Sequence, residues 1–185
     1  MPGLLRTQLG AAYVAVVHRL DRDTGGVMVY ALNPKAAASL SQSVQEHKLE
    51  KHYLAVLRGI PAEETATLED LLFHDKTRNK TYVVDRQRKG VKDARLEYRV
   101  LRTCSGHCLV NVRLHTGRTH QIRVQFASRK LPLVGDGKYG GKANGLPLCL
   151  WSHSLSFPHP ATGNTMTFEA RPPWEKEWET WVTKV

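Results

Sequence analysis

Two stretches of the chain alternate between apolar and polar residues with the period of a β-strand. The apolar positions are Leu96, Tyr98 and Val100 within 94–101, and Cys108, Val110, Val112 and Leu114 within 108–114. Successive side chains of a strand point to opposite faces of its sheet. Each stretch therefore predicts a strand with one buried face.

Shorter apolar runs predict further strands. These runs are Tyr13–Val17, Val27–Leu32, Tyr53–Leu57, Leu148–Trp151 and Thr165–Phe168. Gly25-Gly26 predicts a turn between the first two runs, and Ala161-Thr162-Gly163 predicts a turn between the last two.

Other segments have helical spacing. Asn33, followed by Pro34, is a predicted N-cap, and Thr119 is a second one that starts a helix running towards Arg129. A last, amphipathic helix is opened by Pro172-Pro173. The apolar positions are Ala37, Leu40 and Val44 in the first helix, Ile122 and Phe126 in the second, and Trp174, Trp178, Trp181 and Val182 in the last.

The order of these elements indicates the fold class. Most strands follow one another at hairpin spacing, and the connections are too short for repeated βαβ crossovers. We predict an α+β fold with a mainly antiparallel mixed sheet and a few flanking helices. The 185 residues suit one domain, 1–185, and no internal repeat divides them.

Charge adds a partner to this picture. The chain carries 27 Lys and Arg against 17 Asp and Glu, a formal net charge of +10. Residues 76–92 alone hold seven basic residues and one acid. Such a balance favours a polyanion, with nucleic acid as the first candidate, although a solvated basic surface gives the same pattern.

Other classes of protein fit the sequence less well. The three cysteines are an odd number, which argues against a disulfide framework, and no second pair of cysteines completes a zinc site, because Cys149 stands alone. No apolar run reaches the ~20 residues of a membrane span. The start also lacks the pattern of a signal peptide. We therefore expect no metal and no membrane association, and a cytoplasmic location.

Two polar segments are candidates for chemistry. His18-Arg19-Leu20-Asp21-Arg22-Asp23-Thr24-Gly25-Gly26 lies between two predicted strands, where a sheet can present reactive groups, although a solvated charged turn is the simpler reading. Residues 114–123 place Arg118, His120 and Arg123 near a predicted helix N-terminus, which is suited to a phosphate. A capped helix with basic residues explains that pattern equally well.

Taken together, these segments resemble the RluA-like family of pseudouridine synthases. The family signature His-Arg-Leu-Asp is matched at 18–21, and Gly-Arg-x-His-Gln-[Ile/Leu]-Arg is matched at 117–123. Three further segments are similar to family motifs, namely Lys51 to Gly59, Gly135-Asp136-Gly137-Lys138-Tyr139-Gly140, and Leu155 to Gly163. The motifs occur in the family's order and cover roughly residues 14–170.

The resemblance implies isomerisation of uridine in RNA, with ribosomal and transfer RNA both compatible, without a metal or organic cofactor. It implies that Asp21 is the nucleophile, that Tyr53 stacks under the base as a candidate proton acceptor, and that Arg118 pairs with Asp21. Arg19 would displace the target nucleotide. The remaining expected site residues are His18, His120 and Arg123 as RNA contacts and Leu20 and Ile122 as pocket lining. We expect a monomer.

The chain also departs from the family pattern. Gly25-Gly26 replaces a common Ser-Gly, and Ala127 to Pro132 replaces a common loop containing His-Gly. The strands and the small RNA-binding domain that usually precede the first motif are expected to be missing here. An RNA-binding module without activity is therefore the main alternative, and a phosphoesterase that uses the histidines is a second one.

Overall fold

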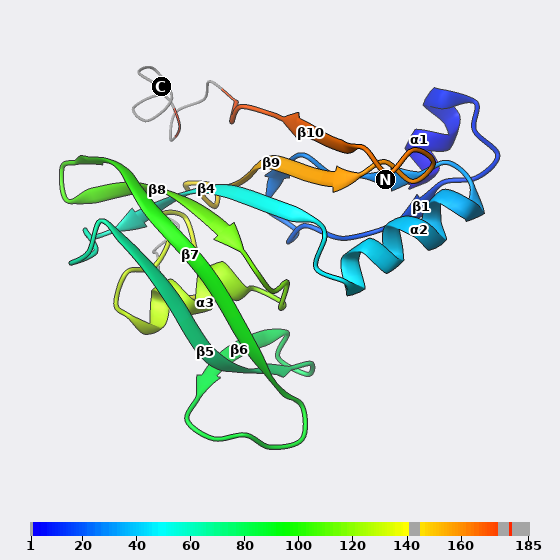
Figure 1. Cartoon of the computed structure of the whole chain (residues 1–185). Coiled ribbons are helices and arrows are strands. Elements are labelled where there is room, and N and C mark those ends of the chain that lie inside the picture. The colour runs from blue at the N-terminus through cyan, green and yellow to red at the C-terminus, as the bar shows by residue number, and fades with distance from the viewer. Residues whose placement is uncertain (1, 141–144, 174–177, 179–185) are drawn as a thin grey trace.

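A twisted sheet with helices packed against it forms the body of the protein (Figure 1). The structure is a computed structural model, and it describes residues 2–140, 145–173 and 178. The strands of the sheet, in spatial order, are β10 (Thr165–Glu169), β9 (Leu150–Pro158), β4 (Glu50–Arg58), β8 (His107–Leu114), β7 (Val91–Cys104), β5 (Thr65–Asp75) and β6 (Lys80–Val84). All these neighbours pair antiparallel. A short strand, β2 (Gly25–Gly26), joins β9 in parallel. The predicted α+β fold with a mainly antiparallel mixed sheet is confirmed.

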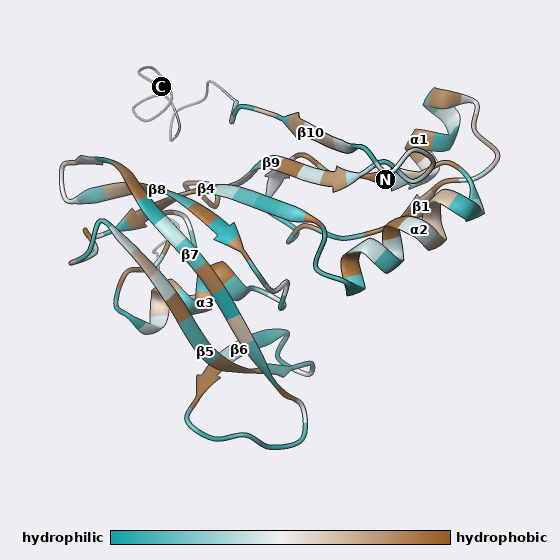
Figure 2. Ribbon diagram, viewed as in Figure 1, coloured by the Kyte–Doolittle hydropathy of each residue, from teal (hydrophilic) through white to brown (hydrophobic). Residues whose placement is uncertain are grey.

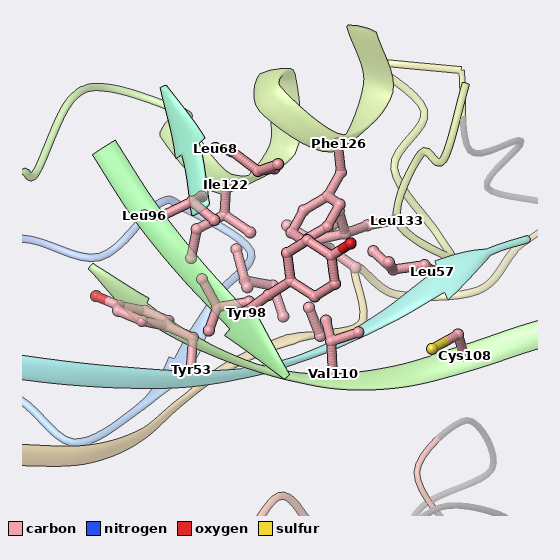
Figure 3. Close-up of a cluster of buried hydrophobic side chains, with 14 residues drawn as sticks. Tyr53, Leu57, Leu68, Leu96, Tyr98, Cys108, Val110, Ile122, Phe126 and Leu133 are labelled. Carbon is pink, nitrogen blue, oxygen red and sulfur yellow. The ribbon is translucent and has the colours of Figure 1, made fainter. Parts of the chain in front are cut away.

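The two alternating stretches occupy β7 and β8 as predicted. Leu96 and Tyr98 of β7 and Cys108, Val110 and Val112 of β8 are buried in one cluster beneath α3 (Gln121–Ser128). Figure 3 shows this cluster, with Ile122 and Phe126 of α3 reaching down to the sheet. Phe126 meets Tyr98 edge to face at 5.4 Å between ring centroids. The sheet and α3 thus share the main core.

The start of α3 differs from the prediction. Thr119 was expected to cap the helix, but the N-cap is His120, which has a left-handed backbone with φ 54° and makes no side-chain capping bond. The carbonyl of Thr119 instead accepts a hydrogen bond from the Thr81 hydroxyl at 2.8 Å. A non-glycine residue in this conformation is uncommon. It sharply redirects the chain before the helix begins.

Much of the N-terminal quarter forms a second, smaller layer. After α1 (Pro2–Leu9), β1 (Ala15–Val16) pairs with β3 (Tyr30–Ala31). The predicted strands 13–17 and 27–32 are therefore reduced to two residues each. The N-cap prediction holds for α2 (Pro34–Gln45), because the Asn33 side chain accepts from the Ala36 N–H at 2.8 Å. Leu40 of α2 packs against β9 residues in this layer.

The prediction of a turn at Gly25-Gly26 is wrong, because these residues form strand β2. A Cβ on Gly25 would lie 2.3 Å from the Trp151 ring, and one on Gly26 would lie 2.1 Å from the Ser152 carbonyl oxygen. Gly26 also has φ +116°. Only glycine permits so close a backbone approach. The glycine pair therefore attaches the preceding loop, residues 17–24, to β9.

The remaining predictions concern the hairpin regions and the tail. Residues 76–92 form the β5–β6 turn, β6 and the loop into β7, and this loop is strongly hydrophilic in Figure 2. The turn at 161–163 joins β9 to β10 as predicted. The helix predicted after Pro173 lies outside the described residues, except for Trp178. Trp178 is buried with Val56, Leu109 and Cys149 on the face of the sheet opposite α3.

Candidate active site

The His-Arg-Leu-Asp segment forms a loop that is held at both ends. Leu20 packs against the main core, while Arg19 beside it is exposed. The Thr24 N–H donates to the Asp21 carbonyl at 3.1 Å, which closes a turn. The glycine pair then enters the sheet as β2. The loop consequently presents Asp21 at a fixed position beside the core.

Asp21 is paired with Arg123. The Nη1 group of Arg123 lies 3.3 Å from Asp21 Oδ2, and the side chains are 7% and 22% exposed, respectively. Burial by itself would lower the pKa of the Arg123 guanidinium, but hydrogen bonds and charge from Asp136, together with Asp21, raise that pKa. Arg123 is therefore a permanent cation at the base of the loop. The sequence had predicted an RNA contact at Arg123, and the structure instead pairs it with Asp21.

The predicted pairing of Arg118 with Asp21 is wrong. Arg118 Nε donates to the Asp93 carbonyl at 2.8 Å, and the Arg118 N–H donates to Gln121 Oε1 at 3.0 Å. The Gln121 N–H donates to the Arg118 carbonyl at 3.1 Å, so this N–H is already paired within the loop. Arg118 still lines the cleft described below.

Tyr53 forms part of the floor. It belongs to β4, and a register shift against β9 falls between His52 and Tyr53. Such irregularities re-aim side chains. Tyr53 is buried at one end of the core cluster, with its hydroxyl pointing away from Tyr98 (Figure 3). Burial raises the pKa of Tyr53 to about 12; a hydrogen bond with Ser152 opposes this shift, and the Asp21 charge adds to it.

His18 is a partly buried ring that binds the backbone beside the loop. Its Nε2 accepts from the Val29 N–H at 3.3 Å, so the ring fixes the backbone where the chain returns from the loop. Burial and the charge of Lys51 lower the pKa of His18 to about 4. The ring is consequently neutral at pH 7, with its proton on Nδ1.

His120 belongs to a buried aromatic group. Its Nδ1 is 2.9 Å from the Tyr139 hydroxyl, which also accepts from the Thr81 N–H at 2.8 Å. Burial lowers the pKa of His120; the Asp21 charge opposes this shift, whereas Arg123 and other cations add to it. His120 therefore lies in the wall of the site with its Nδ1 engaged by Tyr139.

All of the predicted site residues line one open cleft of about 1030 Å³. They are His18, Arg19, Leu20, Asp21, Tyr53, Arg118, His120, Ile122 and Arg123. Among the described residues that line it, Asp21 is the only acid, whereas four are Arg or Lys. One carboxylate in a basic cleft with an aromatic floor suits a nucleophile acting on a polyanion.

Two further features were not foreseen as parts of the site. Lys51 lines the cleft, and its Nζ would lie 3.2 Å from a Cβ on Gly117. Burial lowers the pKa of Lys51. Asp136 binds Arg123 through both of its carboxylate oxygens. Local patterns do not reveal these contacts, although both residues fall in motifs that resemble the family.

Metal and membrane features were also expected to be absent. Within residues 2–140, 145–173 and 178, no group of three or more His, Cys, Asp or Glu side chains could hold a metal ion. No helix in the described part of the chain has the length and apolar character needed to cross a membrane.

Comparison with known proteins identifies the family. The protein-family model described as RNA pseudouridylate synthase matches residues 4–128 of this chain. The chain belongs to this family. A protein of Aquifex aeolicus named uncharacterized RNA pseudouridine synthase is 37% identical over 176 residues, which are 89% of this chain and 55% of that protein. Ribosomal large subunit pseudouridine synthase D of Pseudomonas aeruginosa is 34% identical over 88% of this chain and 54% of its own length.

Solved structures of pseudouridylate synthase domains share this fold. Human RNA pseudouridylate synthase domain containing 1 superposes with a TM-score of 0.80 at 26% identity, covering 92% of this chain and 73% of that one. The resemblance to the RluA-like family is thus confirmed. The chain spans about half the length of the curated pseudouridine synthases that it matches.

Proposed function

We propose that this chain isomerises uridine to pseudouridine in RNA, with Asp21 as the nucleophile. The observation that carries the proposal is the placement of Asp21. It is the only acid among the described residues lining a basic cleft, and it is paired with Arg123 beside the buried Tyr53. Family membership supports the same reaction class.

The reaction needs few groups. The bond from ribose C1′ to uracil N1 breaks, the ring turns, and a bond forms from C1′ to C5. C5 then loses its hydrogen as a proton, and N1 gains one. Atoms and electrons balance, so no redox carrier or energy donor is required. Asp21 can serve by attacking the sugar, by attacking the uracil ring or by assisting elimination.

The substrate uridine must leave its stack to reach Asp21. Extrusion of a base costs roughly a few kcal/mol. Arg19 is the exposed neighbour of Asp21 and lines the cleft, so it is placed to occupy the vacated position. Tyr53 then supports one face of the uracil, while Leu20 and Ile122 line the pocket. The Tyr53 hydroxyl stays protonated at neutral pH. It therefore accepts the C5 proton only while it passes its own proton to a neighbouring acceptor such as water, and it does not start as a base.

The RNA backbone follows the basic rim of the cleft. Asn79, at the β5–β6 turn, lines the cleft, and Lys138 Nζ donates to its carbonyl at 2.8 Å. The basic stretch 76–92 therefore adjoins the site. Arg118 extends the same rim. Binding should fall steeply as salt rises, because phosphate contacts release counterions. We propose that the substrate is ribosomal or transfer RNA, modified in the cytoplasm by a monomer.

Site mapping tests this function. Unmodified ribosomal and transfer RNA are incubated with the chain, and pseudouridine is located by carbodiimide labelling and primer extension. A new stop with the wild type that is absent with Asp21→Asn supports the proposal and names the RNA. Salt-sensitive binding with no stop on any RNA contradicts it and favours a binding module. A phosphoesterase would instead shorten or dephosphorylate the RNA.

A further inference from the structure

We infer that Asp136 is a positioning residue for the isomerisation, acting through Arg123. This inference deepens the proposed function and rests on it. Arg123 has three hydrogen-bonding nitrogens, and Asp136 takes two of them. Nε lies 2.7 Å from Asp136 Oδ2, and Nη2 lies 2.8 Å from Asp136 Oδ1. Nη1 remains for Asp21.

This arrangement fixes the guanidinium plane. A bidentate carboxylate sets both the direction and the rotation of an Arg side chain. The Asp136 side chain is fully buried, and Arg123 is nearly so. The Arg123 guanidinium carbon also lies 5.3 Å from the centroid of the Tyr139 ring, whose hydroxyl is held by Thr81. Arg123 therefore has one orientation in which Nη1 meets Asp21.

Asp136 is itself held by its loop. Its Oδ1 accepts from the Lys138 N–H at 3.1 Å and the Tyr139 N–H at 3.2 Å. Gly135, just before it, has φ +74°, and a Cβ there would lie 1.9 Å from the Pro147 carbonyl oxygen. The Gly-Asp pair thus sets the loop, and the loop sets the carboxylate. Burying this charge is tolerated because every contact to it is a charged or backbone donor.

The consequence concerns the reaction cycle. Arg123 makes one hydrogen bond to Asp21, whereas it makes two to Asp136. When Asp21 engages the substrate, Arg123 keeps its neutralising partner and its direction. Its orientation therefore does not depend on Asp21. Asp136 keeps the cation aimed at the reacting carboxylate through every step.

Asp136→Asn tests the inference against a matched control. The amide cannot satisfy the two Arg123 donors and the two backbone donors together. The control is Asp70→Asn, which removes the carboxylate that binds Arg129 at 2.8 Å and lies outside the cleft. The readouts are the single-turnover rate at saturating RNA, the Kd for RNA and the thermal unfolding midpoint.

We expect Asp136→Asn to lose about 100-fold in the single-turnover rate, the effect of a misplacement of about 1 Å. Its Kd should match the wild type, and Asp70→Asn should keep the rate even where its unfolding midpoint falls. A wild-type rate in Asp136→Asn, a loss confined to Kd, or an equal rate loss in Asp70→Asn would overturn the inference. If Asp136→Asn does not fold, Asp136→Glu replaces it; this variant keeps the charge, shifts Arg123 by a methylene and should lose rate in the same way.

A second measurement does not depend on activity. The Arg123 Nε–H gives a nuclear magnetic resonance signal that is slowed in exchange by its bond to Asp136, and Arg123→Lys assigns it. The signal should persist in Asp21→Asn and disappear in Asp136→Asn. Loss in Asp21→Asn would overturn the inference even if the wild type proves inactive. A wild type that modifies no RNA while this signal behaves as expected would count against the proposed function alone.

Discussion

Arg123 Nη1 donates to Asp21 Oδ2 across 3.3 Å, joining residues that lie 102 positions apart in the chain. One partner comes from the loop before β2 and the other from α3. The contact forms only when α3 packs on the sheet and the glycine pair attaches the loop to β9. The fold therefore assembles the reactive pair as a consequence of forming its main core.

The two arginines of the second motif should separate in their effects. Arg123→Lys removes the forked contacts to Asp136 and Asp21, so the single-turnover rate should fall by about 10²–10³-fold, as when one transition-state donor is removed. Arg118→Lys should keep the rate and weaken RNA binding, because the Arg118 guanidinium binds the Asp93 carbonyl and not Asp21. A larger rate loss in Arg118→Lys than in Arg123→Lys would contradict the pairing of Arg123 with Asp21.

Arg19 should matter most where the target base is stacked. Arg19→Ala is expected to lose far more activity on a structured RNA than on an unpaired oligonucleotide, because only the former needs the vacated position to be filled. Arg22→Ala is the matched control, being an exposed arginine of the same loop that does not line the cleft. Initial rates on the two substrates check this, and equal losses on both would remove the wedge role.

The Tyr53 hydroxyl should act after binding. Tyr53→Phe keeps the aromatic ring in the floor of the cleft. It removes the hydroxyl, which is the only group of this side chain that could relay the C5 proton. We expect unchanged RNA affinity and a fall in turnover of about 10²-fold or more, the range of general acid–base contributions. Release of tritium from RNA labelled at uridine C5 measures the step. Turnover equal to the wild type would leave the hydroxyl without a part.

His18 should make the fold sensitive to acid. Its pKa is about 4 in the folded state against an ordinary value of 6.5, so the unfolded chain binds the proton more readily between these pH values. Stability contributed by the neutral ring is thus complete above pH 6.5 and declines as pH falls towards 4. His18→Gln keeps an acceptor for the Val29 N–H but cannot titrate. Its free energy of unfolding should decline less over this window than that of the wild type; parallel curves would refute the assignment.

Local patterns predicted the parts of the fold that local forces decide. The alternation in β7 and β8 and the Asn33 cap follow from nearest-neighbour geometry, and both are present. The short strands β1 and β3 were overestimated, because their apolar residues pack beneath α2 instead of extending a ladder. Burial alone did not distinguish these two outcomes.

The site was predicted as a set of residues but not in its pairing. Arg118 and Arg123 stand five positions apart on either side of the helix start. Which of them contacts Asp21 depends on the left-handed backbone at His120. The residue types around His120 do not predict that conformation. Asp136 fixes its own loop, but its bond to Arg123 joins segments that only the tertiary fold brings together.

The most direct test compares Asp21→Asn with Asp23→Asn under single-turnover conditions. The second variant removes an exposed acid two residues away that does not line the cleft. With saturating RNA labelled at uridine C5, Asp21→Asn should bind RNA normally and lose about 10⁴-fold or more in tritium release, as when a nucleophile is removed. Asp23→Asn should release tritium at the wild-type rate. Tritium release by Asp21→Asn at the wild-type rate would contradict the assignment of Asp21 as the nucleophile.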